Sequence, residues 1–351
     1  MKTKYARLLQ VMMLASTLGL AGCGGGGGGG ASTGASSAAP ATNTDSNTTS
    51  PTIAAAGYAA GSPQAQIYTL VNNERVACGF GSISESTALD QAALAHANWL
   101  LVNNYTGHYE SAGVPNGYTG VSPQDRGVAA GYTYATSSTS PVPNYVFYQS
   151  GEVYASEGAT AYSPTVAVRQ LLAAPYHVDV MMLGVRNIGI GYEDSNTAGT
   201  TATYGARTLV NIDFGVPAGA TQQDLGSSDV MTYPCQGTTG TALQVYNESP
   251  DPVPGRDQTA NPFGSAVLVA VRNGQTLAIT SASMINASNG SVVTLLTPVT
   301  SANDPNGQLL SNEGYVLPNS PLSPNTQYQV TINGTNSGVA FSRSFTFTTG
   351  S

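Results

Sequence analysis

The stretch SPTVAVRQLLAAPYHVDVMMLGVRNIGIGY, residues 163–192, decides the fold of the central part of the chain. Ser163-Pro164 is a helix-start signal, because proline suits the first helical position, and apolar residues follow at helical spacing. Pro175 ends that helix, and residues 187–192 then read as a strand. The stretch therefore predicts a helix and then a strand, with His177 between them.

The same signals extend over residues 62–232. Ser62-Pro63 and Ser86 each precede a run of apolar residues at helical spacing. Residues 144–148 and 207–214 read as strands. Helices and strands in this mixed order, without a regular βαβ repeat, predict a layered α+β domain.

The pattern changes in residues 233–351, where short β-branched or aromatic runs are separated by Asn, Gly and Pro. This predicts a β-sandwich. Residues 322–328 and 345–349 resemble the Ig-like modules of bacterial surface proteins. We see no site residues in this segment and interpret it as a structural spacer. The expected strands are 265–271, 275–285, 291–298, 327–332 and 342–348.

Residues 1–22 read as an export signal, with three basic residues before an apolar core. The sequence Leu20-Ala21-Gly22-Cys23 resembles a bacterial lipobox, which implies cleavage before Cys23 and attachment of lipid to its sulfur. Gly24 at the next position implies sorting to the outer membrane, on its periplasmic or its cell-surface side. The alternative is an ordinary secretory signal in which Cys23 is incidental.

Residues 23–61 are rich in Gly, Ser, Thr, Ala and Asn, and such a tract cannot bury enough apolar surface to fold. We expect a flexible tether. Without residues 1–22 the chain keeps eight Arg, no Lys and 19 acidic residues, a net charge near −11. The chain therefore has no basic footprint for nucleic acid or anionic lipid, and no lysine for Schiff-base chemistry or a P-loop.

Two cysteines remain beside Cys23. Cys78 and Cys235 form an even pair in a chain with an export signal, which predicts a disulfide. In the chain-entropy model so long a closed loop stabilises the fold by roughly 4–5 kcal/mol. The alternative is two buried free thiols.

The chain contains only three histidines, so few places can support imidazole chemistry. His96 shares its predicted helix with Trp99 and Leu100, and we interpret it as a core or boundary residue rather than a ligand. His108 and His177 lie on either side of the pair Gly151-Glu152 in the sequence.

Motifs between residues 70 and 215 together resemble the CAP superfamily, the cysteine-rich secretory, antigen 5 and pathogenesis-related proteins, in its bacterial form. Their order and spacing carry the resemblance, because no single motif is strong. The motifs are Leu70–Arg75, Ala88–Asp90, His96-Ala97, Gly107-His108, Pro123, Asp125-Arg126, Ala130–Tyr132, Gly151-Glu152, Ala174–His177, Ile188–Gly191 and Val210–Gly215.

The resemblance implies an α-β-α sandwich with a central cleft lined by His108, Glu152 and His177. Two imidazoles and a carboxylate can hold Zn²⁺ or another divalent cation and leave one position open. Without metal, the same groups can polarise a water molecule. The family has a second cleft glutamate, for which Glu157 is the nearest candidate here. Val153 stands where the family has Asn, which favours binding over catalysis.

Other residues near the expected cleft have simpler interpretations. Asp125-Arg126 fits an ion pair at a helix start better than a substrate contact. Several tyrosines fall in or near the cleft, and we expect most of them to pack with only the hydroxyl hydrogen-bonded. These are Tyr118, Tyr132, Tyr145, Tyr148, Tyr154 and Tyr176.

Three functions fit the sequence. The first is a lipid-anchored envelope protein whose cleft binds a lipid, a peptide or a cell-wall fragment, with or without a divalent cation. The second is a metal-dependent hydrolase, a peptidase above all, in which Glu152 is the general base and His108 and His177 bind the metal. The third is a non-catalytic adhesin or scaffold.

Overall fold

A computed structural model describes residues 46–351 apart from 115, 136–149, 158–162, 183 and 246, and for residues 150–157 it describes backbone pairing only. The expected signal peptide and Cys23 lie outside these residues. The described helices are α1 (Pro63–Ala77), α2 (Thr87–Val102), α3 (Pro123–Ala129), α4 (Pro164–Ala173), α5 (Pro175–Met182) and α6 (Thr201–Tyr204).

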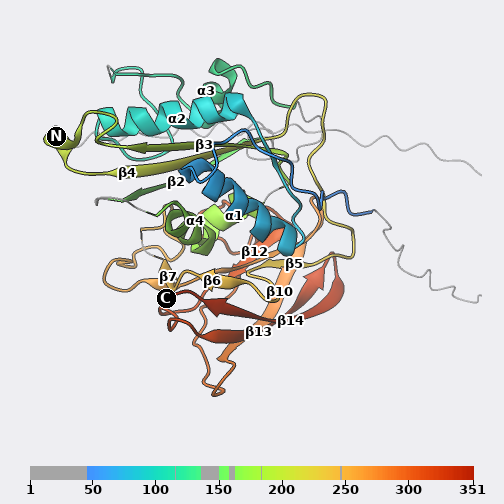
Figure 1. The fold of residues 1–351 in the computed structure, drawn as a ribbon. Coiled ribbons are helices and arrows are strands. Elements are labelled where there is room, and N and C mark those ends of the chain that lie inside the picture. The colour runs from blue at the N-terminus through green and yellow to red at the C-terminus, as the bar shows by residue number, and fades with distance from the viewer. Residues whose placement is uncertain (1–45, 115, 136–149, 158–162, 183, 246) are drawn as a thin grey trace, which may run out of the picture. The chain divides into compact units, whose positions relative to one another are not determined.

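The first sheet has the order β1-β3-β4-β2, in which only the β1–β3 pairing is parallel. Its strands are β1 (Ser84–Glu85), β2 (Ser150–Glu157), β3 (Asn187–Asp194) and β4 (Thr208–Gly215). Helix α2 covers one face, and α1 and α4 cover the other (Figure 1). Leu209 of β4 packs with Trp99 of α2, whereas Ile212 joins the core of α1 and α4. The predicted α+β class is confirmed.

The helix starts follow the predicted signals. The Ser62 side chain accepts a hydrogen bond from the Ala65 backbone N–H at the start of α1, and Ser86 caps α2 in the same way. Pro175 does end α4, but it is also the first residue of α5. His177 therefore lies in the first turn of a helix and not in a loop, because proline at the first helical position lacks only an N–H that has no helical partner.

Two glycines of β3 allow α2 to lie directly on the sheet. A Cβ atom at Gly189 would come within 2.1 Å of the Leu89 carbonyl carbon, and one at Gly191 within 2.4 Å of the Ala93 carbonyl carbon. No side chain fits in this space. The Gly-x-Gly spacing thus sets the distance between the sheet and the helix that precedes His108.

Among the described residues after β4, the regular elements are all strands. They are β5 (Met231–Tyr233), β6 (Thr239–Thr241), β7 (Gln244–Val245), β8 (Phe263–Gly264), β9 (Val267–Ala270), β10 (Leu277–Asn286), β11 (Val299–Thr300), β12 (Glu313–Val316), β13 (Gln327–Asn336) and β14 (Val339–Thr349).

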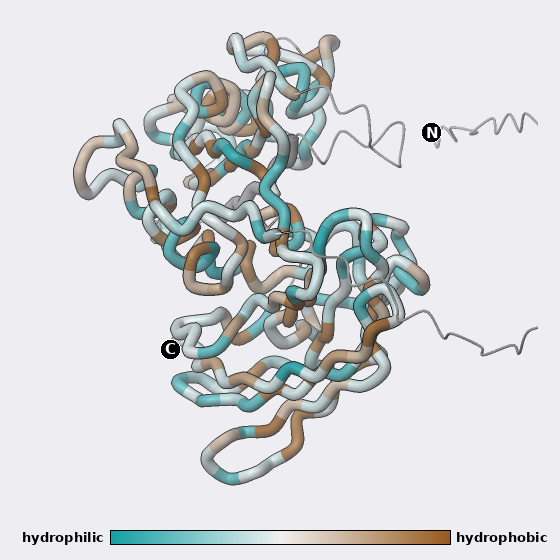
Figure 2. Tube along the Cα trace, turned by 90° about the vertical axis from the view of Figure 1, so that its right-hand side faces the viewer, coloured by the Kyte–Doolittle hydropathy of each residue, from teal (hydrophilic) through white to brown (hydrophobic). Residues whose placement is uncertain are grey.

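Two four-stranded sheets, β10-β13-β14-β6 and β11-β12-β9-β5, share one apolar core that includes Val269, Ile332 and Phe347. Figure 2 shows hydrophobic and hydrophilic residues alternating along these strands. The strand expected at residues 291–298 is absent, and only isolated bridges form there. Val292 is 79 % exposed, so the alternation in this stretch does not mark a buried face.

Residues 43–351 form one compact unit. Leu268 of β9 belongs to the core of α1 and α4, and Tyr176 of α5 packs with Phe263 and Leu317. Two apolar clusters therefore join the β-rich segment after residue 233 to the α/β segment before it.

Residues 46–61, which the composition places in the flexible tether, contact the folded part of the chain. The Tyr58 hydroxyl donates to the Asp90 carboxylate at 2.6 Å, and the Ser50 backbone N–H donates to the Gln223 side chain at 2.7 Å. Ala56 and Tyr58 also pack against the main core. The expectation of a flexible tether is therefore wrong for residues 46–61, which these backbone and side-chain contacts hold against the folded part.

Candidate functional site

The structure brings His108 and His177 together. Their ring centroids lie 6.3 Å apart, with a 41° angle between the ring planes. His108 lies in the loop after α2, and His177 lies in the first turn of α5. Both side chains are partly exposed. Segments far apart in the sequence thus place two of the three histidines of the chain at one surface.

Glu152 and Glu157 both lie on β2, opposite Asp213 and Thr208 of β4. Their carboxylates lie outside what the structure describes. The Asp213 side chain is buried, and Asn211 donates a long hydrogen bond to it at 3.5 Å. The expected third member of the site therefore stays a prediction.

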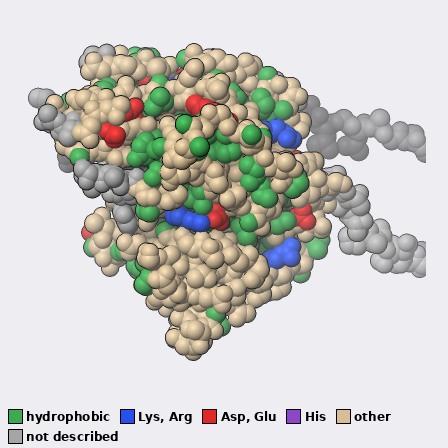
Figure 3. Space-filling view, in the orientation of Figure 1, with side chains coloured by type: hydrophobic (Ala, Val, Ile, Leu, Met, Phe, Trp, Pro, Cys, Tyr) green, Lys and Arg blue, Asp and Glu red, His purple; other side chains and the backbone are tan. Residues whose placement is uncertain are grey.

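Charged residues are only 9 % of this chain, and Figure 3 shows them scattered over one face of the molecule. A buried charged side chain is unusual in such a chain and usually has a partner. Glu248 is one of these: its side chain is 1 % exposed, and its Oε2 lies 2.7 Å from Nδ1 of His177.

Glu248 is the residue of the candidate site that the sequence patterns missed. It lies 71 residues after His177, in the loop between β7 and β8, where no periodic pattern identifies it. The one available signal is scarcity, because residues 233–351 contain only five acidic side chains. The interpretation of this segment as a spacer without site residues is therefore incomplete.

The pKa of His177 lies above its ordinary value. Burial lowers this pKa, but the negative charge of Glu248 and its hydrogen bond to the ring together raise it by more. A cation would have to compete with this proton, because only a neutral imidazole binds metal.

A buried network holds the loop that carries His108. The Arg126 guanidinium donates to the His108 carbonyl at 3.1 Å and lies 3.8 Å from the Glu110 carboxylate. His96 contacts Glu110 through Nδ1 and the Gly107 carbonyl through Nε2, both at 3.0 Å. His96 is fully buried, as expected for a core residue.

The expected Asp125-Arg126 ion pair is absent. Asp125 instead completes a capping box with Ser122 at the start of α3, while Arg126 points to the network below His108. A neighbouring position in a helix gives side chains different directions, which explains why the two residues separate. Arg126 thus contacts the backbone of the His108 loop.

The tyrosines divide into several groups. Tyr118 is 40 % exposed, Tyr132 is buried and donates to Asn187, and the buried Tyr176 donates to Asp304 at 2.5 Å. Tyr145 and Tyr148 lie outside the described residues, as does the Tyr154 side chain. Most of the described tyrosines therefore pack with a bonded hydroxyl.

Two imidazoles that bind one tetrahedral zinc ion at 2.0–2.1 Å have ring centroids roughly 5–6 Å apart. The observed 6.3 Å between His108 and His177 is within reach of this geometry after a small ring movement. Among the described side chains, no group of three His, Cys, Asp or Glu residues forms a metal cluster. A cation at these histidines would therefore need Glu152, or ligand and water oxygens, to complete its coordination.

Asp179 of α5 and Glu313 of β12 form a buried pair of acidic residues. The carboxyl groups of Asp179 and Glu313 share a hydrogen bond beside a cavity of about 50 Å³. Burial, followed by the proximity of Glu313, raises the pKa of Asp179 well above its usual range, and burial raises the pKa of Glu313 to about 7. One carboxyl donates its proton to the other.

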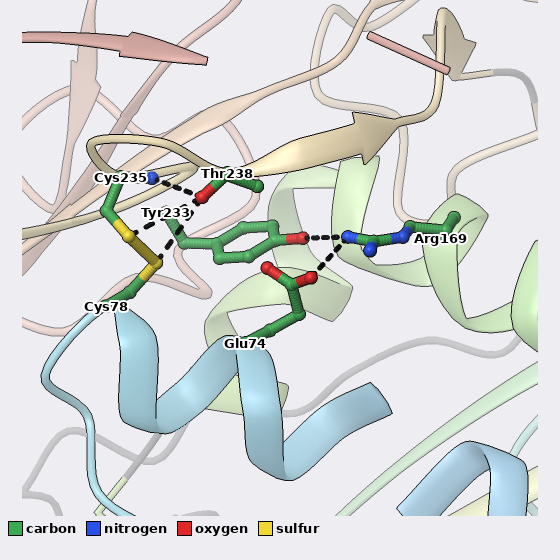
Figure 4. Close-up of a disulfide and its surroundings, with 6 residues drawn as sticks. All are labelled: Glu74, Cys78, Arg169, Tyr233, Cys235 and Thr238. Carbon is green, nitrogen blue, oxygen red and sulfur yellow. Dashed lines mark hydrogen bonds and ion pairs between the residues drawn. A yellow bond between two sulfur atoms is a disulfide. The ribbon is translucent and has the colours of Figure 1, made fainter. Parts of the chain in front are cut away.

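The disulfide between Cys78 and Cys235 is confirmed, with an S–S distance of 2.07 Å (Figure 4). The Thr238 hydroxyl lies 3.5 Å from the Cys235 sulfur. Beside it, Arg169 of α4 bonds the Glu74 carboxylate at 2.7 Å and the Tyr233 hydroxyl at 3.4 Å. The disulfide thus ties the end of α1 to the segment that follows β5, and Arg169 links α1 and α4 to β5 through polar contacts.

No protein-family model matches the chain, and no curated protein matches it. Among the described residues, no helix is both long and apolar enough to cross a membrane. The resemblance to the CAP superfamily and the Ig-like assignment are carried by the sequence motifs alone.

Proposed function

We propose that the chain is an envelope lipoprotein with a CAP-type domain and an Ig-like region. Its cleft binds a lipid, a peptide or a cell-wall fragment through His108, His177 and Glu152, with a divalent cation as an optional partner. The observation that carries this proposal is the 6.3 Å separation of the His108 and His177 rings, which the motif order anticipates. The second support is the carboxylate behind His177.

The residues divide the work of binding in this proposal. Nε2 of His177 and the ring of His108 face the ligand or the cation, and Glu152 supplies negative charge. A cation, when bound, would supply Lewis acidity for a carbonyl or phosphoryl oxygen. Arg126 and Glu110 keep the His108 loop in place from below.

Calorimetric titration of the full chain with Zn²⁺ tests the cation part of the proposal. We expect about one ion per chain, with binding lost in His108→Ala and in His177→Ala. Asp257→Asn is the matched control, because this exposed carboxylate of the β7–β8 loop bonds only the nearby Thr259 and Ala260 backbone N–H groups in the described structure; we expect it to keep the wild-type affinity. Wild-type protein without binding, or histidine variants with unchanged binding, would refute the cation site.

The anchor is tested separately, by mass spectrometry of the mature protein from its host. The lipobox predicts an N-terminal Cys23 that carries a diacylglyceryl group, and Cys23→Ser prevents that modification. A mature chain with an unmodified Cys23, or one cleaved at another position, would leave secretion without an anchor.

A second candidate function is metal-dependent hydrolysis. Histidines that bind catalytic metals commonly donate their other N–H to a carboxylate, and Nδ1 of His177 lies 2.7 Å from the Glu248 carboxylate. This candidate predicts turnover of peptide or ester substrates that chelators abolish and that Glu152→Gln removes. A zinc-loaded chain inactive on a broad peptide and ester library would argue for binding alone.

A further inference from the structure

We propose that Glu248 is a positioning residue for His177, and that the C-terminal β-rich segment is thereby a working part of the site. The Glu248 carboxylate holds the imidazole as its Nδ1–H tautomer and leaves Nε2 as the nitrogen with a free lone pair. This inference rests on the proposed use of His177 in binding.

The two carboxylate oxygens have separate partners. Oε1 accepts from the Tyr176 backbone N–H at 2.9 Å, and Oε2 lies 2.7 Å from Nδ1 of His177. A carboxyl group is a stronger acid than an imidazolium, so the proton between Oε2 and Nδ1 belongs to the ring. In free neutral histidine the proton instead favours Nε2, so Glu248 reverses the ordinary preference.

Glu248 is itself held in place. Its backbone N–H donates to the Gln258 side-chain oxygen at 2.8 Å, and its carbonyl accepts from the Gln258 amide at 3.0 Å. Its carboxylate also satisfies a first-turn N–H of α5, which has no partner within the helix. A fixed acceptor at a helix N-terminus gives the His177 ring one orientation.

The β-rich segment contacts the neighbouring residue independently. The Tyr176 hydroxyl donates to Asp304 at 2.5 Å and accepts from the Asn306 amide at 3.0 Å. Asp304 therefore offers a matched control, because it is an acidic residue of the same segment at the same helix start that does not bond His177.

The exchange Glu248→Gln makes a directional prediction. The Tyr176 backbone N–H is always a donor, so the new amide must turn its oxygen toward it. The amide nitrogen then faces Nδ1 of His177, which becomes an acceptor, and the ring proton moves to Nε2. Glu248→Gln is therefore expected to reverse the tautomer without changing the shape of the side chain, whereas Glu248→Ala restores the ordinary mixture.

The tautomer is measured by ¹⁵N NMR of the histidine rings of the full chain, at a pH where His177 is neutral. Three histidines make the spectrum simple, and the His96 ring signals report whether each variant keeps the fold. We expect Nδ1–H in wild type and in Asp304→Asn, and Nε2–H in Glu248→Gln. Zn²⁺ titration of the same samples should show a 10- to 100-fold loss of affinity in Glu248→Gln alone.

The two proposals fail differently. A wild-type His177 with Nε2–H, or a tautomer unchanged in folded Glu248→Gln and Glu248→Ala, overturns the positioning role. Wild-type protein that shows the Nδ1–H tautomer but binds no zinc keeps the positioning role and removes the cation. The wild-type spectrum decides the question even where a variant does not fold.

Discussion

His96 and His177 both place Nδ1 beside a glutamate, yet they differ in what remains of the ring. His96 is fully buried, and both of its ring nitrogens make internal contacts, Nδ1 with Glu110 and Nε2 with the Gly107 carbonyl. His177 is 15 % exposed at its side chain, and the structure describes one hydrogen-bond partner for it, Glu248. A histidine that bonds a carboxylate through one ring nitrogen is thus available for chemistry when no internal contact occupies the other ring nitrogen.

The largest expected effect on stability comes from removing the imidazole ring of His96, compared with removing that of His177. His96→Ala leaves the buried Glu110 without its imidazole and should lower the free energy of unfolding by about 3–5 kcal/mol. His177→Ala, at the partly exposed site, should cost about 1–2 kcal/mol. Denaturant unfolding of both variants measures the difference. Equal losses would end the distinction between a structural and a functional histidine.

A buried carboxyl without any imidazole partner gives the next effect. Glu313 has a folded-state pKa of about 7, above its unfolded value, so its stabilising contribution exists at low pH and is lost as pH rises toward 7. Glu313→Gln removes that loss and should stabilise the chain by about 2 kcal/mol at pH 8, with no gain near pH 4. Thermal melts across this range measure the effect.

The exposed Asp257 provides the control, because Asp257→Asn should leave the melting temperature unchanged both at pH 8 and near pH 4. A Glu313→Gln chain that is less stable than wild type at pH 8 would contradict this prediction. It would show that the contact between the two buried carboxyl groups stabilises the fold by more than the ionisation of Glu313 destabilises it.

The smallest effect is the pH dependence of the His177–Glu248 pair. The pKa of His177 is raised in the folded state, so the pair contributes stability below the ordinary histidine pKa and loses it as pH rises through the folded value. Glu248→Gln should therefore lower the free energy of unfolding by more at pH 5.5 than at pH 9. Urea unfolding at both values measures it, and a pH-independent cost would mean that the ring charge plays no part.

Local patterns predicted the elements well because their causes are local. A serine cap, a proline at the first helical position and alternating β-branched residues act within a few residues of the chain. Helices α1, α2 and α4 begin at these signals, and four of the five expected C-terminal strands form close to their predicted bounds, as β9, β10, β13 and β14. The short strands β5, β6, β7, β8, β11 and β12 were not predicted. Pro175 shows where local patterns fail. The same residue ends α4 and starts α5, and the sequence signals alone did not indicate α5, whose Tyr176 packs against distant residues.

Only part of the candidate site could be predicted from the sequence. The motif order placed His108 and His177 in one cleft, and their rings are adjacent. Glu248 was not predictable, because a single carboxylate in an irregular loop leaves no periodic trace and its partner lies 71 residues away. The anchoring of residues 46–61 was not predicted for a similar reason: a few contacts, among them those of Ser50 and Tyr58, hold a segment whose composition predicts flexibility.

The disulfide closes a loop between residues 78 and 235, and both His108 and His177 lie inside it. A protease that cuts the backbone once anywhere in this interval therefore releases no fragment: the two pieces stay joined through sulfur. Glu248 stays attached to the same assembly as His177, and a nicked molecule would keep its mass until a reductant separated it. The cross-link thus protects the completeness of the site as well as the stability of the fold.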